Sequence, residues 1–299
     1  MALDERAALA LVAAEFPAAG DDCAVVDGTV VTTDMLHETT DFPPGTTRYT
    51  AGWRAVGASL SDVAAMGASA TCAVAAYAAV ELDETELGDF VRGARDVCEA
   101  VGASYVGGDL DTHREFTTAT TAIGRTDDPV RRSGAAPGDL LCVTGELGRS
   151  AAAVRLFEAG ETDRANELFR FTPRVAAGVA LRGSATAMMD SSDGLARSVH
   201  QLAAASDCGF ELDFDALPVH DAVAEVATDS DDRRDLAAFF GEDFELVFAL
   251  PESALDAARD ATDVPLTVVG KAVEEATEAA VVADGEAVPD RGYTHGRNE

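Results

Sequence analysis

The sequence contains almost no lysine: Lys271 is the only one among 299 residues, so nearly all of the positive charge comes from arginine. With 54 acidic residues against 22 basic ones, the formal net charge is −32. Nonspecific nucleic-acid binding and binding to anionic membranes both require clustered basic side chains. We therefore expect no nucleic-acid partner and no membrane partner, and we expect most acidic residues to be solvated surface groups.

Cysteine is also sparse, and its pattern is uninformative. The five cysteines are scattered singly, with no Cys-x-x-Cys pair, so we expect no disulfide framework and no zinc site, and the five histidines show no metal-ligand spacing. The N-terminus carries charges where a signal peptide needs an apolar run, so we expect no targeting segment. The uncharged stretch 63–80 is rich in alanine and predicts a helix end followed by a buried strand. These features favour a reducing, cytoplasmic location.

Common nucleotide-binding and hydrolase signatures are missing as well. Gly270-Lys271 is followed by Ala272 rather than by Ser or Thr, so the sequence has no P-loop. No Gly-x-Gly-x-x-Gly follows a predicted strand, and there is no Gly-x-Ser-x-Gly or plausible Cys/His pair. If the protein binds nucleotides, the phosphate charge must be neutralised by something other than a P-loop lysine.

Predicted strands and helices are mixed in both halves of the chain. The clearest helix is 83–101, where Asp83 and Glu86 have capping-box spacing and apolar residues recur with a 3.6-residue period. Asp27-Gly28 predicts a hairpin turn between strands 24–26 and 29–35. Further helices are predicted over 3–16 and 48–66, and further strands over 72–80, 104–106, 116–124, 140–144, 209–214, 244–248 and 266–269.

A breaker-rich run at 131–139, with two glycines and one proline, predicts a domain boundary. We place an N-terminal domain at 1–136 and a C-terminal α/β domain at 137–299. Because each half mixes strands with helices, the predicted fold class is α/β, in the mixed α+β sense.

Three carboxylates stand in apolar surroundings that surface acidity does not explain. Asp62 lies inside an apolar helix, whereas Asp34 and Asp109 lie where apolar strands are predicted to end. Two carboxylates about 4 Å apart repel by roughly 4 kcal/mol at an effective dielectric near 20, so a cluster needs cations. Oxygen ligands from Asp and Thr select hard ions, above all Mg²⁺ when phosphates share the coordination. The sequence therefore predicts several Mg²⁺ ions that neutralise phosphate charge.

Seven motifs, in order along nearly the whole chain, resemble the thiamine-monophosphate kinase family. They lie at 32–36, 60–67, 107–109, 132–135, 137–139, 190–195 and 241–246. The first three are shared with a wider superfamily of ATP-dependent synthetases that includes aminoimidazole ribonucleotide synthetase, whereas the last two indicate the kinase more narrowly. The resemblance implies the two-domain fold of that superfamily, with ATP between the domains and with the N-terminal sheet paired to that of a second subunit in a homodimer.

The resemblance also implies roles for individual residues. Asp34, Asp62 and Asp109 are the expected catalytic residues, and Asp41 stands where bacterial family members place a substrate-contacting histidine. Val101 stands at the family's nucleotide-side tyrosine. The expected metal positions are Asp22, Thr32, Thr33, Asp34, Asp62, Asp109, Asp190 and Asp193. The expected ATP-binding positions are Gly108, Asp109, Arg132 and Ser192, and the expected substrate-binding positions are Asp41, Glu242 and Tyr293.

The implied reaction is ATP-dependent phosphorylation of thiamine phosphate to thiamine diphosphate. Its acceptor is already an anion at neutral pH, so no strong general base is required. The acidic, lysine-poor composition also resembles that of proteins from salt-loving archaea. Alternatives are another synthetase of the superfamily, of the selenophosphate synthetase or hydrogenase-maturation kind, and a nonenzymatic nucleotide-sensing protein. A selenophosphate synthetase would need a reactive cysteine near a lysine, and a hydrogenase-maturation relative would need a cysteine at the C-terminus. Loss of the carboxylates would favour a nonenzymatic protein, and all of them are present.

Overall fold

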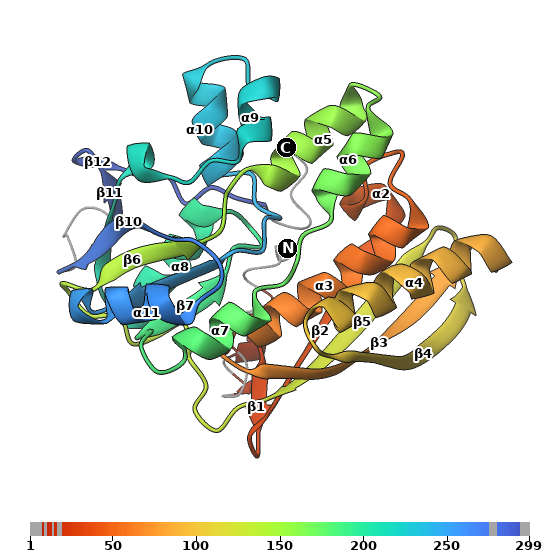
Figure 1. Ribbon diagram of the computed structural model, residues 1–299, viewed down its shortest axis with the longest axis horizontal. Helices are drawn as coiled ribbons and strands as arrows, with labels where there is room; N and C mark the ends of the chain where they lie inside the picture. The colour runs from red at the N-terminus through yellow and green to blue at the C-terminus, as the bar shows by residue number, and fades with distance from the viewer. Residues whose placement is uncertain (1–7, 9–10, 14, 17–19, 275–279, 294–299) are drawn as a thin grey trace.

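The computed structural model describes residues 8, 11–13, 15–16, 20–274 and 280–293, and it contains two sheets that lie side by side (Figure 1). Most of the predicted helix over 3–16 lies outside the described residues. The first sheet has the strand order β1-β2-β5-β3-β4. Its strands are β1 (Ala24–Val26), β2 (Thr29–His37), β3 (Ser69–Ala79), β4 (Ser104–Thr112) and β5 (Thr117–Arg125). The helices of this half are α2 (Glu38–Asp41), α3 (Arg48–Ala65) and α4 (Glu84–Ala100).

Local sequence signals account for much of the first half. Asp27 and Gly28 both have positive φ, 48° and 73°, as a tight hairpin turn between β1 and β2 requires. The side chain of Asp83 accepts hydrogen bonds from the backbone nitrogens of Thr85 and Glu86, and so caps α4. The predicted hairpin is therefore confirmed, and the predicted helices 48–66 and 83–101 correspond to α3 and α4.

Two strands run further than the sequence predicted. Asp34 lies in the middle of β2, which continues to His37. β4 passes through Gly107 and Asp109 instead of ending before them. Gly107, with a φ of 132°, lies at a bulge that shifts the register against β3, and after this bulge the parallel pairing resumes. The expectation that both carboxylates mark strand ends was wrong because it assumed that glycines end a strand.

The two faces of the first sheet differ sharply. Helices α3 and α4 cover one face, and among the described residues no helix covers the other, which we call the outer face (Figure 1). Met35 and Val106 are 58% and 61% exposed on it. The outer face thus presents apolar side chains to solvent, which is uncommon for an isolated sheet.

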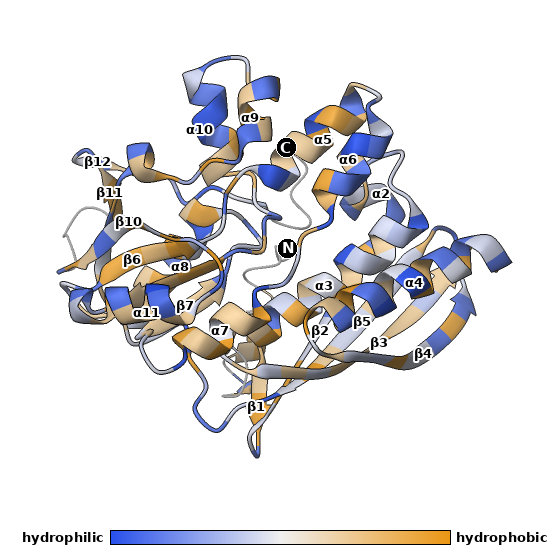
Figure 2. Ribbon diagram, in the orientation of Figure 1, coloured by the Kyte–Doolittle hydropathy of each residue, from blue (hydrophilic) through white to orange (hydrophobic). Residues whose placement is uncertain are grey.

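The second sheet has seven strands in the order β12-β11-β8-β10-β6-β9-β7. In Figure 2, β6 is largely hydrophobic and α10 largely hydrophilic, as expected of a central strand and a surface helix. Strands β11 and β12 were not predicted. The strands are β6 (Leu140–Thr144), β7 (Ala187–Asp190), β8 (Gly209–Leu212), β9 (Leu246–Leu250), β10 (Leu266–Val273), β11 (Val281–Ala283) and β12 (Glu286–Ala287). The helices are α5 (Arg149–Glu158), α6 (Thr162–Phe169), α7 (Val175–Leu181), α8 (Leu195–Ser206), α9 (Asp221–Val226), α10 (Ser230–Ala238) and α11 (Leu255–Ala261).

Helix α3 packs against both halves at glycines. A Cβ atom on Gly93 of α4 would lie 2.0 Å from the carbonyl oxygen of Tyr49 on α3. A Cβ atom on Gly178 of α7 would lie 2.1 Å from the carbonyl oxygen of Ala64 at the other end of α3. Only glycine permits backbones to approach this closely. α3 is therefore fixed between its own domain and the second half of the chain.

Candidate active site

Three carboxylates from distant parts of the chain meet where the two halves join. Asp22 precedes β1, Asp62 lies on α3 and Asp190 ends β7, and one oxygen of each lies within 4.8 Å of the others. Asp22 and Asp190 are buried and Asp62 is partly buried. The sequence placed all three among its metal positions, and the fold brings them together.

Residues of β2 and α3 support this cluster. Thr32 donates a hydrogen bond from its hydroxyl to Oδ2 of Asp62 at 2.6 Å, and Ser59 donates to Oδ2 of Asp34 at 2.5 Å. Oδ2 of Asp190 is buried and has no hydrogen-bond partner among the described residues. A buried acceptor without a donor is costly, and an oxygen-coordinated cation would satisfy it. The donor set therefore fits a hard divalent ion.

The pKa values of the clustered carboxyls are displaced upward. Burial raises the pKa of Asp62 well above its ordinary value, and the charges of Asp34, Asp190 and Asp22 raise it further. Burial, followed by the charge of Asp22, raises the pKa of Asp190 to about 8. Without a cation, the cluster avoids repulsion by holding protons near neutral pH.

The metal-free protein should therefore lose stability as the pH rises from about 4 to about 8. Folded Asp190 keeps its proton up to about 8, whereas the unfolded chain releases it near 3.8, so the folded state binds more protons across this window. Each pH unit costs about 1.4 kcal/mol for one such proton. The check is denaturant unfolding in EDTA across this range. Asp190→Asn should have a shallower slope, and equal slopes would contradict the expectation.

Arg132 supplies a fixed positive charge beside the cluster. Its Nη2 and Nε atoms donate to the two carboxylate oxygens of Asp22 at 2.9 and 3.2 Å. Burial by itself lowers the pKa of Arg132, but the charges of Asp22, Asp190 and Asp62 outweigh it and raise that pKa above its ordinary value. Arg132 therefore stays charged, in a position to share its guanidinium with an incoming anion.

The loop that follows Asp190 is hydrogen-bonded to two other segments. The backbone nitrogen of Glu242 donates to the carbonyl oxygen of Ser192 at 2.6 Å, and that of Tyr293 donates to the carbonyl oxygen of Asp193 at 3.2 Å. Gly241 has a φ of 88°, and a Cβ atom there would lie 2.5 Å from the Ser192 oxygen. Backbone hydrogen bonds therefore connect the loop that contains the predicted ATP-binding residue Ser192 to the predicted substrate residues Glu242 and Tyr293.

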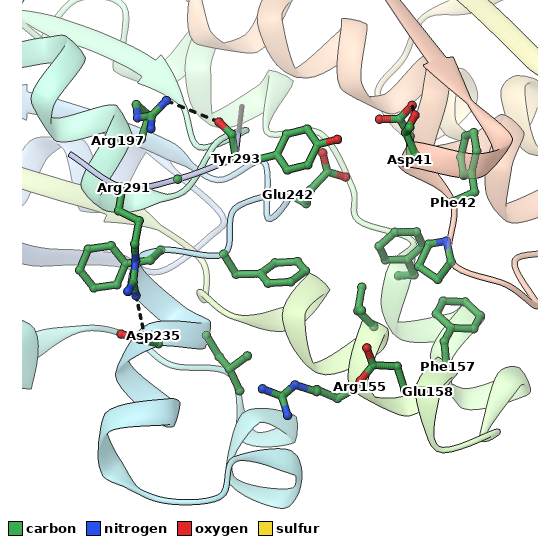
Figure 3. A pocket seen from close by; sticks show the side chains of 18 of the residues that line it. Asp41, Phe42, Arg155, Phe157, Glu158, Arg197, Asp235, Glu242, Arg291 and Tyr293 are labelled. Atoms are coloured by element: carbon green, nitrogen blue, oxygen red, sulfur yellow. Dashed lines mark hydrogen bonds and ion pairs between the residues drawn. The ribbon is translucent and has the colours of Figure 1, made fainter. Parts of the chain in front are cut away.

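A cavity of about 1090 Å³ lies beside these segments and is lined by residues of both halves. All three predicted substrate residues line it, and Figure 3 shows Asp41 opposite Glu242 and Tyr293. Oδ2 of Asp41 accepts a hydrogen bond from the backbone nitrogen of His37 at 2.7 Å, which holds Asp41 at the end of α2. Phe42 and Phe157 add aromatic walls. The cavity thus combines carboxylates with aromatic rings.

Two predicted metal residues lie apart from the cluster. Thr33 points to the outer face and donates its hydroxyl to the carbonyl oxygen of Thr120. Asp109 is exposed and pairs with Ala76, whose neighbours along β3 are buried, so Asp109 also belongs to the outer face. β2 and β4 are separated by two strands, which sets them roughly 14 Å apart. One chain therefore does not bring Asp109 to Asp62.

Sequence reasoning missed two residues that complete the site. Ser59 lies three residues before Asp62 on the same helix, a spacing that places both side chains on one face. Arg54 is a buried, charged residue on α3. Its position among small and apolar residues is the same sequence signal that pointed to Asp62. Val101, at the C-terminal end of α4, is partly buried and packs against the core of the first half.

Comparison with known proteins identifies the family. Residues 20–126 match the N-terminal domain of AIR synthase related proteins, and residues 136–283 match the C-terminal domain. The chain is 63% identical over 293 residues to thiamine-monophosphate kinase of Halobacterium salinarum, covering 98% of this chain and 100% of that one. The chain belongs to the thiamine-monophosphate kinase family. It is therefore a phosphotransferase, and the predicted family, enzyme class and fold class are confirmed.

Further relatives and solved structures are similar to this chain over most of its length. The protein of Methanospirillum hungatei is 40% identical, with 92% of each chain covered. The solved structure of AaThiL complexed with AMPPCP and TMP matches with a TM-score of 0.89 at 27% identity, covering 99% of both chains. The hydrogenase maturation protein HypE in complex with ATP, at 20% identity and a TM-score of 0.71, covers 92% of this chain and 86% of its own and shares the fold alone. In the part of the chain that the structure describes, no helix is long and apolar enough to cross a membrane.

Proposed function

We propose that this chain transfers the γ-phosphate of ATP to thiamine phosphate, giving thiamine diphosphate and ADP. The observation that carries the proposal is the direct backbone link between the loop after Asp190 and the two cavity-lining residues Glu242 and Tyr293. It sets an acceptor cavity beside a carboxylate cluster suited to metal-bound phosphates. The AaThiL structure, which carries AMPPCP and TMP together, supports the same pairing of ligands. We place ATP between domains 1–136 and 137–299.

We infer that the cluster binds Mg²⁺, held by Asp22, Asp62 and Asp190. The orphaned oxygen of Asp190 and the raised pKa values support this inference. Mg²⁺, when bound, neutralises phosphate charge and orients the transferring group. Thr32 fixes the orientation of Asp62, and Arg132 adds a permanent charge for the ATP phosphates. Asp193 and Ser192 complete the proposed metal and nucleotide positions of this chain, whereas Gly108 lies beside Asp109 on β4.

The cavity suits thiamine phosphate by charge and by shape. The thiazolium ring is a permanent cation, and the carboxylates of Asp41 and Glu242 face the cavity together with the ring of Tyr293. A cation is attracted both to carboxylates and to the face of an aromatic ring. We propose that these three residues bind the organic part of the acceptor and leave its phosphate directed toward the cluster.

Thiamine phosphate should be phosphorylated at least about a hundredfold faster than free thiamine. The phosphate acceptor is an anion at neutral pH, whereas the hydroxyl of thiamine would require a general base, and general-base catalysis typically contributes about 10²–10⁴-fold. The assay contains ATP, Mg²⁺ and either acceptor in molar KCl, with the products separated by chromatography. A similar rate with free thiamine would contradict the mechanism, and no product with either acceptor would contradict the function.

We propose that two chains pair through their outer faces. Exposed apolar side chains such as Met35 and Val106, on a face that no described helix covers, support a second copy as the partner. Asp109 lies on this same face, away from the cluster of its own chain. We propose that Asp109 of the partner subunit, together with Thr33, completes the metal and ATP site.

We further propose that the enzyme works in the cytoplasm at high salt. All five cysteines are free, four of them buried, as a reducing compartment allows. The net charge of −32 produces self-repulsion that salt screens. The high identity to a protein of Halobacterium salinarum supports the same setting.

A further inference from the structure

Arg54 is a buried arginine whose contacts all lie on the second half of the chain. It belongs to α3, and its side chain is 3% exposed. Its Nη1 atom donates to the carbonyl oxygen of Phe169 at 2.5 Å and to the hydroxyl of Ser150 at 3.3 Å, and its guanidinium stacks 3.5 Å above the Phe169 ring. Its Nη2 atom donates to the carboxylate of Glu242 and to the Glu242 carbonyl oxygen. The guanidinium is therefore fixed on several sides, and one of these is a residue of the cavity wall.

Glu242, the ion-pair partner of Arg54, has an unusual backbone conformation. Its φ is 64°, in the left-handed region that side chains other than glycine rarely adopt, and it follows Gly241 with a φ of 88°. Its backbone nitrogen is held by Ser192, and its side chain is 30% exposed toward the cavity. The hydrogen bond to Ser192 fixes the backbone, whereas the direction of the carboxylate depends on Arg54.

We propose that Arg54 is a positioning residue for the phosphate acceptor, acting through Glu242. It holds the Glu242 carboxylate at the cavity wall in the orientation that binds the cationic part of thiamine phosphate. The inference rests on the proposed contact between Glu242 and that substrate. α3 also carries Asp62, eight residues and therefore about 12 Å along the same rigid helix. Helix α3 therefore positions the proposed metal ligand Asp62 directly and positions Glu242 of the cavity wall through the ion pair with Arg54.

A purely structural role for Arg54 would have different consequences. Removing one partner of a buried ion pair destabilises a protein wherever the pair lies, so lost stability does not distinguish the two roles. The chain offers a matched control three residues further along the same loop. Glu245 accepts hydrogen bonds from Nε and Nη2 of Arg174 at 2.7 and 2.5 Å, and neither residue lines the cavity. Arg174→Met therefore removes a comparable pair that does not face the acceptor.

The experiment measures kcat, the KM for each substrate and the melting temperature of Arg54→Met, Arg54→Lys, Arg174→Met and Glu242→Gln. Arg54→Met should raise the KM for thiamine phosphate about tenfold and leave the KM for ATP within about twofold. Arg54→Lys retains the cation and should recover most of the loss. Arg174→Met should lower the melting temperature without changing either KM. The double variant Arg54→Met/Glu242→Gln should have the same KM for thiamine phosphate as Glu242→Gln alone.

Each other outcome overturns a specific statement. If Glu242→Gln raises the KM for thiamine phosphate but Arg54→Met does not, Arg54 does not position Glu242, while the substrate contact of Glu242 stands. If Arg54→Met raises that KM and Glu242→Gln does not, Arg54 does not act through Glu242, and the inference is wrong. If neither variant changes it, both the inference and the proposed substrate contact are wrong. Additive effects in the double variant would also contradict an action through Glu242.

Discussion

Replacing Asp62 with asparagine should lower kcat by about a thousandfold while the protein remains folded. Asparagine keeps the size of the side chain and its bond to Thr32, but it removes the charge at the centre of the Asp22, Asp62 and Asp190 cluster. Electrostatic groups aimed at a transferring phosphate are typically worth about 10²–10³-fold each. The check is turnover with saturating ATP and thiamine phosphate, with circular dichroism as a test of folding.

Asp231→Asn is the control for this substitution. Asp231 is also acidic, but its side chain is 84% exposed, and its ion pair with Arg234 is a surface pair between neighbouring turns of α10. Such pairs contribute little to stability and nothing to a site they do not face. The kcat of Asp231→Asn should stay within about twofold of that of the unmodified protein. Equal losses from Asp62→Asn and Asp231→Asn would mean that Asp62 is only one acidic residue among many.

Two inactive variants should restore activity when they are combined in one dimer. If Asp109 of the partner subunit serves the cluster containing Asp62, a heterodimer of Asp62→Asn and Asp109→Asn chains has one site with both residues intact. Its activity should reach about half that of the unmodified dimer, because one of two symmetric sites is complete. Each variant alone should have near-background activity. The heterodimer is prepared by coexpression with two different affinity tags and tandem purification.

The matched control is a heterodimer of Asp62→Asn with Asp190→Asn. Both residues contribute to the same cluster within one chain, so this heterodimer has no complete site and should remain inactive. If the Asp62→Asn and Asp109→Asn heterodimer is equally inactive, Asp109 acts within its own chain, and the proposed pairing through the outer face loses its main support. A monomer in solution by light scattering would have the same consequence.

Features that depend on local chemistry could be predicted from the sequence. The hairpin at Asp27-Gly28 follows from the positive φ that its turn requires, and α4 follows from its cap and its apolar period. Asp62 was identified because a charge within an apolar helix is costly without compensation. In each case the deciding interaction lies within about one turn of the chain, where sequence spacing and spatial distance agree.

Features that depend on strand register and distant contacts could not be predicted in this way. The bulge at Gly107 decides which face of the sheet Asp109 occupies, since a shift of one residue reverses every side chain that follows. The pairing of Arg54 with Glu242 joins residues 188 positions apart. The surroundings of Asp109 depend on how β2, β5, β3 and β4 align, and the pairing of Arg54 with Glu242 depends on how the two halves pack together. No local pattern contains that information.

The glycine contacts of α3 have a consequence for substrate entry and product release. Because the backbone of Gly178 lies directly against the backbone of α3 at Ala64, the two halves cannot swing apart there without breaking a contact that has no intervening side chains to adjust. A hinge-like opening of the kind that admits substrates to many two-domain enzymes is therefore closed to this fold at that point. If thiamine phosphate binds in the proposed cavity, it and its product then pass the side chains that line the cavity, such as Phe42 and Tyr293. Motions of these side chains, rather than domain motions, would then set how fast the product leaves.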